Sequence, residues 1–155
     1  MNFPILSIIT FLPFVAAIIM LLMPADRKNE VRGVALATAV VDLLLAGWLY
    51  LQYLTGHMTG YQFIETYNWL PALGISLKFG VDGMSAPLVL LTGIVMFTGV
   101  LISWGVYDEA HHVSAGIQDR PREFFAFLFL LAGGVFGVFV SLDLFMLFFF
   151  YEIAV

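Results

Sequence analysis

The sequence has 155 residues, of which 62% are hydrophobic and only 11% carry a charged side chain, and its formal net charge is −5. A typical soluble domain has about 25% charged residues, so this composition excludes an ordinary water-soluble core and favours helices that are apolar on every face and surrounded by lipid. Six scattered Lys and Arg residues exclude a basic nucleic-acid-binding face, and the absence of Cys excludes disulfide bonds and a Cys-ligated iron–sulfur cluster within this chain.

The first apolar segment predicts a membrane-spanning helix over about residues 3–24. No charged residue occurs between Met1 and Ala25, and about 20 helical residues are enough to cross the hydrocarbon core of a bilayer. A secretory signal peptide is the alternative interpretation. It is disfavoured because no positive charge precedes Phe3 and no convincing small-residue cleavage site follows the apolar run.

A second span is expected over residues 33–54, after a charged loop at 25–32, and only Asp42 interrupts its apolar pattern. This position falls near the middle of the predicted span. An ionised carboxylate there costs about 2.5–3.5 kcal/mol, so such a residue needs a partner, a water-filled cavity or a proton. Two interpretations of Asp42 stay open: a hydrogen-bonding anchor for a helix, or a residue on a proton path.

Residues 56–82 have a mixed composition with Pro and Gly, which predicts a loop. The alternation of apolar and polar residues at 74–79 indicates a short strand or hairpin arm at the membrane interface. Asp82 is the expected N-cap of a third span at 84–106, and Pro87 comes early enough to be tolerated in its first turn.

A polar loop is expected at 107–122, followed by a fourth span at 124–141. His111 and His112 are adjacent, so on a helix they would diverge by about 100° and would not chelate one metal ion together. We therefore expect no metal site, and no nucleotide-, flavin- or other cofactor-binding motif is visible. The spacing of Gly133 and Gly137 predicts close packing of helices, and Glu123 suits the start of its helix.

The fifth apolar segment, residues 143–155, contains the acid of greatest interest. Asp143 is expected to cap this helix. Glu152 follows about 13.5 Å further along the helix axis, close to the middle of the membrane. Its position favours a functional role over the alternative of a permanently protonated Glu that bonds a neighbouring helix.

The predicted fold is an all-α, polytopic membrane helix bundle, in which residues 1–155 form the N-terminal part of one membrane domain. It has four complete transmembrane helices and a truncated fifth. The fifth rises only about 21 Å, which is less than the ~30 Å thickness of the hydrocarbon core. A chain end there would leave carbonyl groups without hydrogen bonds in lipid, so we expect a longer protein.

The distribution of Lys and Arg predicts the orientation of the bundle. The loop at 25–32 has three such residues, the loop at 56–82 has only Lys78, and the loop at 107–122 has two. The positive-inside rule therefore places the first and third loops in the cytoplasm, and the N-terminus and the 56–82 loop outside. We expect a multi-pass protein of the plasma (inner) membrane.

Three stretches resemble the antiporter-like subunits of respiratory complex I. Residues 73–85, with Leu91-Thr92-Gly93 after them, resemble the segment that enters their third helix. Residues 124–140 resemble their fourth helix, and residues 143–152 resemble their fifth. The Val81-Asp82-Gly83 form and the Phe-rich approach to Glu152 are most similar to the subunit M family, the counterparts of mitochondrial subunit 4.

The resemblance implies a proton-translocating membrane-arm subunit of an NADH:quinone oxidoreductase, with no redox site in this chain. Its implied partners are other membrane-arm subunits, the lipid bilayer and protons, with no nucleic acid. Glu152 matches the fifth-helix glutamate, which in the family pairs with a lysine on the seventh helix. Motion of such a lysine would load and release a proton. Asp42 matches no element of the family pattern.

Two other functions stay open from the sequence. One is a subunit of a multi-component sodium/proton antiporter, which shares these helices. The other is a structural membrane scaffold, in which the acids only cap helices or form hydrogen bonds.

Overall fold

The computed structural model describes residues 4–56, 60–70, 74–105 and 120–155. His111, His112 and most of the predicted 107–122 loop lie outside these described residues. The interpretation of the His pair as part of a solvated loop therefore stays a prediction.

Four long helices and one shorter helix make up most of the described chain. They are α1 (Ile5–Leu22), α2 (Lys28–Thr55), α3 (Ser85–Gly105), α5 (Pro121–Val140) and α6 (Leu144–Ala154). The first four are long and apolar enough to cross a membrane, which confirms the predicted helical membrane bundle. α2 begins at Lys28 rather than at the predicted residue 33, and the acidic Glu30 in its first turn suits that end of the helix dipole.

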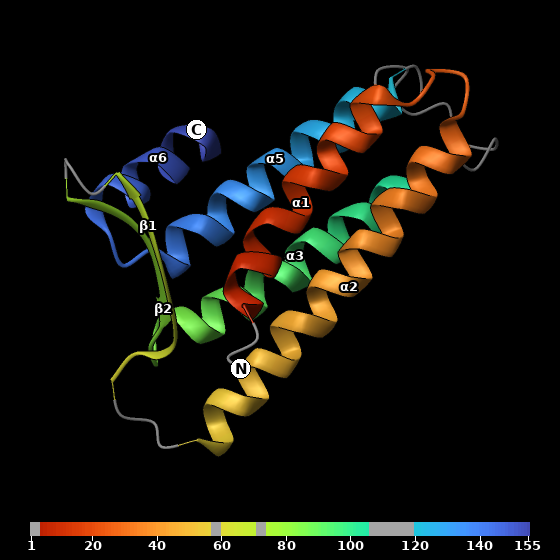
Figure 1. Cartoon of the computed structure of the whole chain (residues 1–155). Coiled ribbons are helices and arrows are strands. Elements are labelled where there is room, and N and C mark those ends of the chain that lie inside the picture. Colours follow the sequence, from red (N-terminus) through yellow and green to blue (C-terminus); the bar gives the residue numbers. More distant parts are fainter. Residues whose placement is uncertain (1–3, 57–59, 71–73, 106–119) are drawn as a thin grey trace.

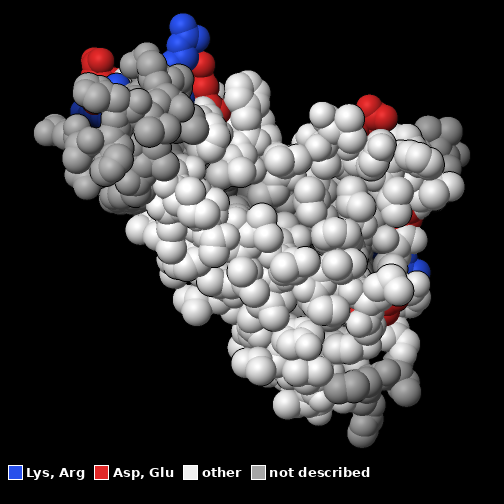
Figure 2. All heavy atoms as spheres, turned by 180° about the vertical axis from the view of Figure 1, so that it is seen from behind, with Lys and Arg blue, Asp and Glu red and all other residues white. Residues whose placement is uncertain are grey.

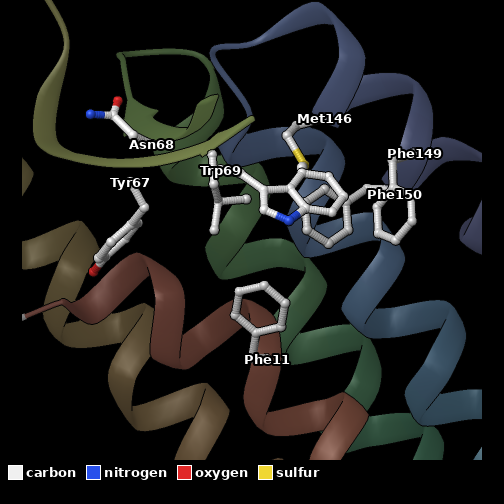
Figure 3. A pocket seen from close by; sticks show the side chains of 8 residues that line it. Phe11, Tyr67, Asn68, Trp69, Met146, Phe149 and Phe150 are labelled. Atoms are coloured by element: carbon white, nitrogen blue, oxygen red, sulfur yellow. The ribbon is translucent and has the colours of Figure 1, made fainter. Parts of the chain in front are cut away.

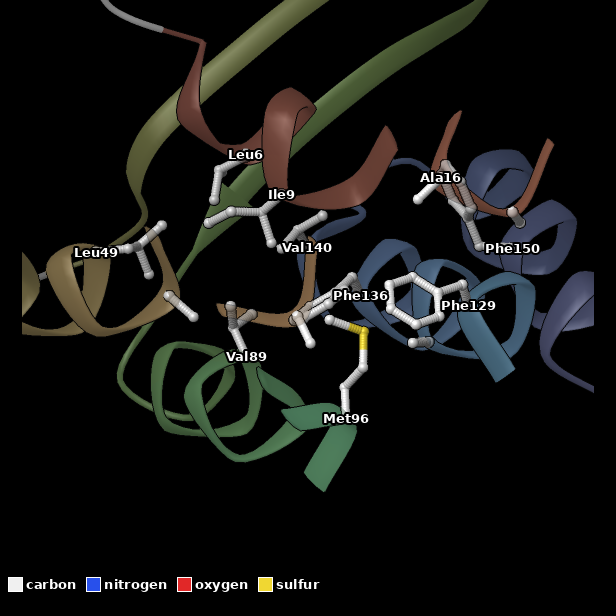
Figure 4. Packing of buried hydrophobic residues seen from close by; sticks show 14 of the residues in the cluster. Leu6, Ile9, Ala16, Leu49, Val89, Met96, Phe129, Phe136, Val140 and Phe150 are labelled. Atoms are coloured by element: carbon white, nitrogen blue, oxygen red, sulfur yellow. The ribbon is translucent and has the colours of Figure 1, made fainter. Parts of the chain in front are cut away.

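The long helices pack side by side, and α6 lies against α5 at one end of the bundle (Figure 1). α1 contacts α5 and α2, while α3 contacts α2 and α5. Large side chains from these helices point into a common core, where Ile9 of α1, Met96 of α3 and Phe136 of α5 approach one another (Figure 4). α2 contributes Leu49 (Figure 4) and several small residues: Ala35, Ala39 and Ala46 are fully buried.

A β-hairpin covers the end of the bundle at which α1 begins (Figure 1). Strands β1 (Gln62–Leu70) and β2 (Ile75–Val81) pair in antiparallel register. The predicted arm at 74–79 is confirmed as the start and body of β2, whereas β1 falls in a stretch predicted only as loop. The register shifts between Gln62 and Glu65, which places one extra residue in β1, and Phe63 there has a φ of 54°.

The outer surface of the bundle is apolar over its middle. Charged atoms occupy only the margins of the face seen in Figure 2. Large hydrophobic side chains are exposed along the helices, among them Leu44, Ile102 and Phe127, each about two-thirds exposed (67%, 69% and 66%). An exposed apolar band on four helices of spanning length is the surface that lipid requires, and the chain is a multi-pass membrane protein segment.

Candidate functional site

The start of α6 is fixed by its own cap and by the hairpin. The Asp143 carboxylate accepts hydrogen bonds from the backbone N–H groups of Phe145 (2.9 Å) and Met146 (3.2 Å), which confirms its predicted capping role. Just before it, the N–H of Leu142 donates to the carbonyl of Lys78 on β2 at 2.8 Å. The helix that carries Glu152 therefore begins at a defined place against the hairpin.

Glycines of α5 allow α1 and α6 to pack closely against it. A Cβ at Gly137 would lie 2.2 Å from Cγ of Phe150, and one at Gly134 would lie 3.0 Å from the backbone nitrogen of Ala154. On the α1 side, a Cβ at Gly133 would lie 2.8 Å from the ring of Phe14. The predicted role of these glycines in close packing is therefore confirmed.

Phe150 is the residue that anchors α6 to the bundle. Its side chain is only 1% exposed. Its ring centroid lies 6.1–6.3 Å from the centroids of three other rings, those of Phe11, Phe14 and Phe79. These contacts fix which face of α6 is turned toward α1, α5 and β2.

Glu152 lies on the other side of α6, where its side chain is exposed. Two residues along an α-helix correspond to a rotation of about 200°, so burial of Phe150 turns Glu152 away from the bundle. The residue predicted to handle protons is thus presented on the outer surface of an apolar helix, free to meet a group from outside this bundle.

Asp42 occupies the opposite kind of environment. Its side chain is fully buried, and neither carboxylate oxygen has a hydrogen-bond partner within the described part of the chain. α2 packs on α1 and α3, whereas α6 packs on α5. The structure therefore does not bring Asp42 and Glu152, the two acids singled out from the sequence, into one site.

An apolar pocket of about 340 Å³ lies between the hairpin, α1 and α6. Trp69 and Met146 point toward each other across it, with Phe11 on the α1 side (Figure 3). Its polar lining residues are Tyr67, Asn68 and Trp69, so it offers no acid or base for proton chemistry. Glu152 does not line it.

Glu65 is an important residue that the sequence reasoning missed. Its carboxylate accepts hydrogen bonds from the backbone N–H groups of Leu6 (2.8 Å) and Ser7 (3.0 Å), and from the Ser7 hydroxyl. It is only 8% exposed. The available signal was indirect: α1 has no side-chain cap at Pro4, so its first N–H groups needed an acceptor from elsewhere.

Comparison with known proteins shows which proteins this chain resembles. No family model matches the chain. It is 38% identical over 152 residues to an NAD(P)H-quinone oxidoreductase chain 4 of Picosynechococcus sp., an alignment that covers 98% of this chain and 26% of the relative. It is 33% identical to the chloroplastic chain 4 of Chara vulgaris, covering 98% of this chain and 29% of the relative.

The chain is homologous to these chain 4 subunits. It corresponds to their N-terminal part and spans about a quarter of their length, 26% in the Picosynechococcus relative. The predicted resemblance to the N-terminal part of an antiporter-like subunit of the subunit M type is thereby confirmed.

Solved structures agree with the chain 4 assignment. A chain of respiratory complex I from Thermus thermophilus with bound NADH superposes with a TM-score of 0.72 at 25% identity, covering 96% of this chain and 27% of that one. A chain of the membrane-bound sulfane sulfur reductase, an archaeal respiratory membrane complex, gives 0.73 at 20% identity, covering 98% and 28%. The second likeness shows the shared fold alone.

Proposed function

We propose that this chain 4 segment belongs to a proton-translocating membrane-arm subunit of an NAD(P)H:quinone oxidoreductase in the plasma membrane, and that Glu152 transfers protons in it. The homology to chain 4 supports the type of complex. The observation that carries the role of Glu152 is its position: a carboxyl group on an apolar helix, on the face opposite the buried Phe150.

The position of Glu152 supports a way in which it would exchange a proton. The cap at Asp143 and the contact of Phe150 with Gly137 fix α6, so the carboxyl group is held at one height on the outside of the bundle. A cation from the rest of the subunit that approaches this face would favour the ionised carboxylate, and its departure would favour uptake of a proton. The proposal assigns no cofactor to this chain, since proton exchange needs only the carboxyl group and a movable partner.

Substitution of Glu152 tests the proposal in the full-length subunit within its complex. Glu152→Gln preserves the size and hydrogen-bonding capacity of the side chain but cannot ionise. We expect the complex to assemble and to lose most proton translocation per quinone reduced, measured in reconstituted membranes. Glu152→Asp keeps the charge, one methylene closer to the backbone, and should retain part of the translocation.

Glu123→Gln is the matched control. Glu123 is a partly exposed acid in the first turn of α5, where it forms surface ion pairs with Arg120 (3.5 Å) and Arg122 (3.7 Å), and such pairs contribute little. This variant should translocate protons normally. A fully coupled Glu152→Gln complex would refute the proton-transfer role and favour a permanently protonated structural glutamate.

A further inference from the structure

The core of the bundle contains a carboxyl group that the proposed role of Glu152 does not use. Asp42 is fully buried, and among the described residues its two oxygens have no hydrogen-bond partner. Burying a polar group without a hydrogen bond costs about 1–3 kcal/mol by protein mutational data. The residues on either side of it in the buried stripe of α2 are Ala39 and Ala46, which offer it no polar side chain.

The spanning helices of this chain supply no cation beside Asp42, which favours its neutral form. The sequence has no Lys, Arg or His between residues 33 and 55, in α1, in α3, or between residues 123 and 140. No cation from this chain is therefore available at the depth of Asp42. A buried carboxylate without a cation is unfavourable, whereas a protonated carboxyl group only needs hydrogen bonds.

Thr10 on α1 is the second unsatisfied polar group of the core. Its side chain is fully buried, and its hydroxyl oxygen has no hydrogen-bond partner in the described residues. A helical Thr or Ser usually bonds the carbonyl four residues earlier, as Thr98 does with Ile94 (2.8 Å) and Ser103 does with Gly99 (2.8 Å). Thr10 does not use this local solution.

Thr10 and Asp42 lie in the same layer of the bundle. α1 and α2 are neighbours that run in opposite directions and are joined by the short connection at 23–27 (Figure 1). Thr10 lies about 18 Å before the end of α1, and Asp42 lies about 21 Å after the start of α2, at a rise of about 1.5 Å per residue. Their depths therefore differ by only about 3 Å.

α1 offers a further acceptor in this layer. Pro13 lies inside α1 and is buried. Because proline has no N–H, it cannot donate the helical hydrogen bond to the carbonyl of Ile9, four residues earlier. Ile9 is a fully buried residue, and its carbonyl oxygen therefore lacks the helical hydrogen bond from residue 13.

We propose that Asp42, the Thr10 hydroxyl and the Ile9 carbonyl form a buried site that binds one proton, on Asp42, together with a bridging water molecule. The protonated carboxyl group and the hydroxyl each supply a donor, and the carbonyl supplies an acceptor. A water molecule with two donors and two acceptors can connect these groups, as buried waters do with otherwise unsatisfied polar atoms. The site belongs to α1 and α2 and is separate from Glu152.

Infrared spectroscopy of the full-length subunit in its complex tests the site without relying on transport. A protonated carboxyl group absorbs at a C=O stretching frequency distinct from that of a carboxylate. We expect Asp42→Asn to remove one such band and Asp42→Glu to replace it with a shifted one. Thr10→Val, which removes the hydroxyl, and Pro13→Ala, which restores an N–H for the Ile9 carbonyl, should each shift the band.

Thr98→Val is the matched control, because the hydroxyl of Thr98 is exposed and bonded within α3; it should leave the band unchanged. If Asp42→Asn does not assemble, the Asp42→Glu, Thr10→Val and Pro13→Ala spectra still decide. An ionised Asp42, seen as the absence of a band that responds to any substitution at residue 42, overturns the proposal. A band from Asp42 that neither Thr10→Val nor Pro13→Ala shifts overturns it as well. Because proton translocation is not measured, the result is independent of the outcome for Glu152.

Discussion

Glu65, Asp82 and Asp143 each place a carboxylate at the N-terminal end of a helix, where free backbone N–H groups and the helix dipole favour negative charge. Asp82 and Asp143 do so within three residues of their own position, so local sequence was enough to predict both. Glu65 reaches a helix that lies 58 residues earlier in the chain. No local pattern encodes that pairing, which depends on the hairpin folding over the start of α1.

Replacing Glu65 should loosen the start of α1. Glu65→Ala removes the acceptor of three hydrogen bonds and leaves the buried N–H of Leu6 without a partner, at a cost of about 1–3 kcal/mol. Glu65→Gln keeps one acceptor oxygen and should cost less. The free energy of unfolding of the full-length subunit in detergent measures both. Glu123→Ala, at a partly exposed surface site, is the control. An equal loss of stability in both Ala variants would contradict the role of Glu65 at the start of α1.

Asp82 should make stability depend on pH in the acid range. The hydrogen bond from the backbone N–H of Ser85 holds the pKa of the Asp82 carboxyl below its ordinary value of 3.8. A pKa that is lower in the folded state stabilises the fold above the unfolded value, and this contribution is lost as the pH falls through the lowered folded value.

The comparison with Asp82→Asn isolates this contribution, because Asn can cap the helix but does not titrate. We expect the free energy of unfolding of the wild type to fall more than that of Asp82→Asn between pH 6 and pH 3, while the other acids contribute equally to both. A constant difference between the two proteins over that range would exclude the effect.

At the scale of helices and strands, the contact between α5 and α6 depends on glycine. Gly137→Ala would place a Cβ 2.2 Å from the Phe150 ring, so α6 or the ring must move, at a cost of about 1–3 kcal/mol. Gly99→Ala has nothing within 4 Å and should be neutral or stabilise by up to about 1 kcal/mol. The free energy of unfolding of the full-length subunit distinguishes the Gly137→Ala variant from the Gly99→Ala variant.

The double variant Gly137→Ala/Phe150→Ala tests whether the added methyl group destabilises the protein through the Phe150 ring. Removing the ring removes the clash, so the double variant should lose less stability than the sum of the two single losses. Strictly additive losses would show that the added methyl group acts on something other than Phe150.

Helices were easier to predict than strands because a spanning helix requires a long charge-poor run, whereas a strand shows only a short alternation of side chains. Four charge-poor runs of spanning length define α1, α2, α3 and α5. In β2, alternation of side chains indicated a strand, whereas β1 contains a register shift that breaks the period of two. Burial of Asp42 and exposure of Glu152 depend on which neighbours pack against α2 and α6, which the sequence of either helix alone does not contain.

For the whole molecule, the charges at the two ends of the bundle predict its orientation in the membrane. Arg122 donates a hydrogen bond to the carbonyl of Met23 at 3.2 Å, so the connection after α1 and the start of α5 share one end. Lys78 lies on the hairpin at the opposite end (Figure 1). The positive-inside rule places the Arg-containing end in the cytoplasm.

Cysteine labelling tests this orientation directly, since the chain has no cysteine of its own. Tyr61, which is 57% exposed on the hairpin side, and Asn29, at the start of α2, are suitable positions for single cysteines. An impermeant reagent should label Tyr61→Cys from outside and Asn29→Cys from the cytoplasm. The reverse pattern would invert the topology.

The hydrogen bonds of Glu65 also have a consequence for synthesis. Glu65 follows Ser7 by 58 residues, and at about 5–20 residues per second the ribosome adds that length in roughly 3–12 s. During this interval the residues of α1 and α2 are synthesised before the acceptor for the first turn of α1 exists. Those N–H groups need another hydrogen-bond acceptor until the hairpin forms, so the bonds to Glu65 can form only after α1 and α2 have been synthesised.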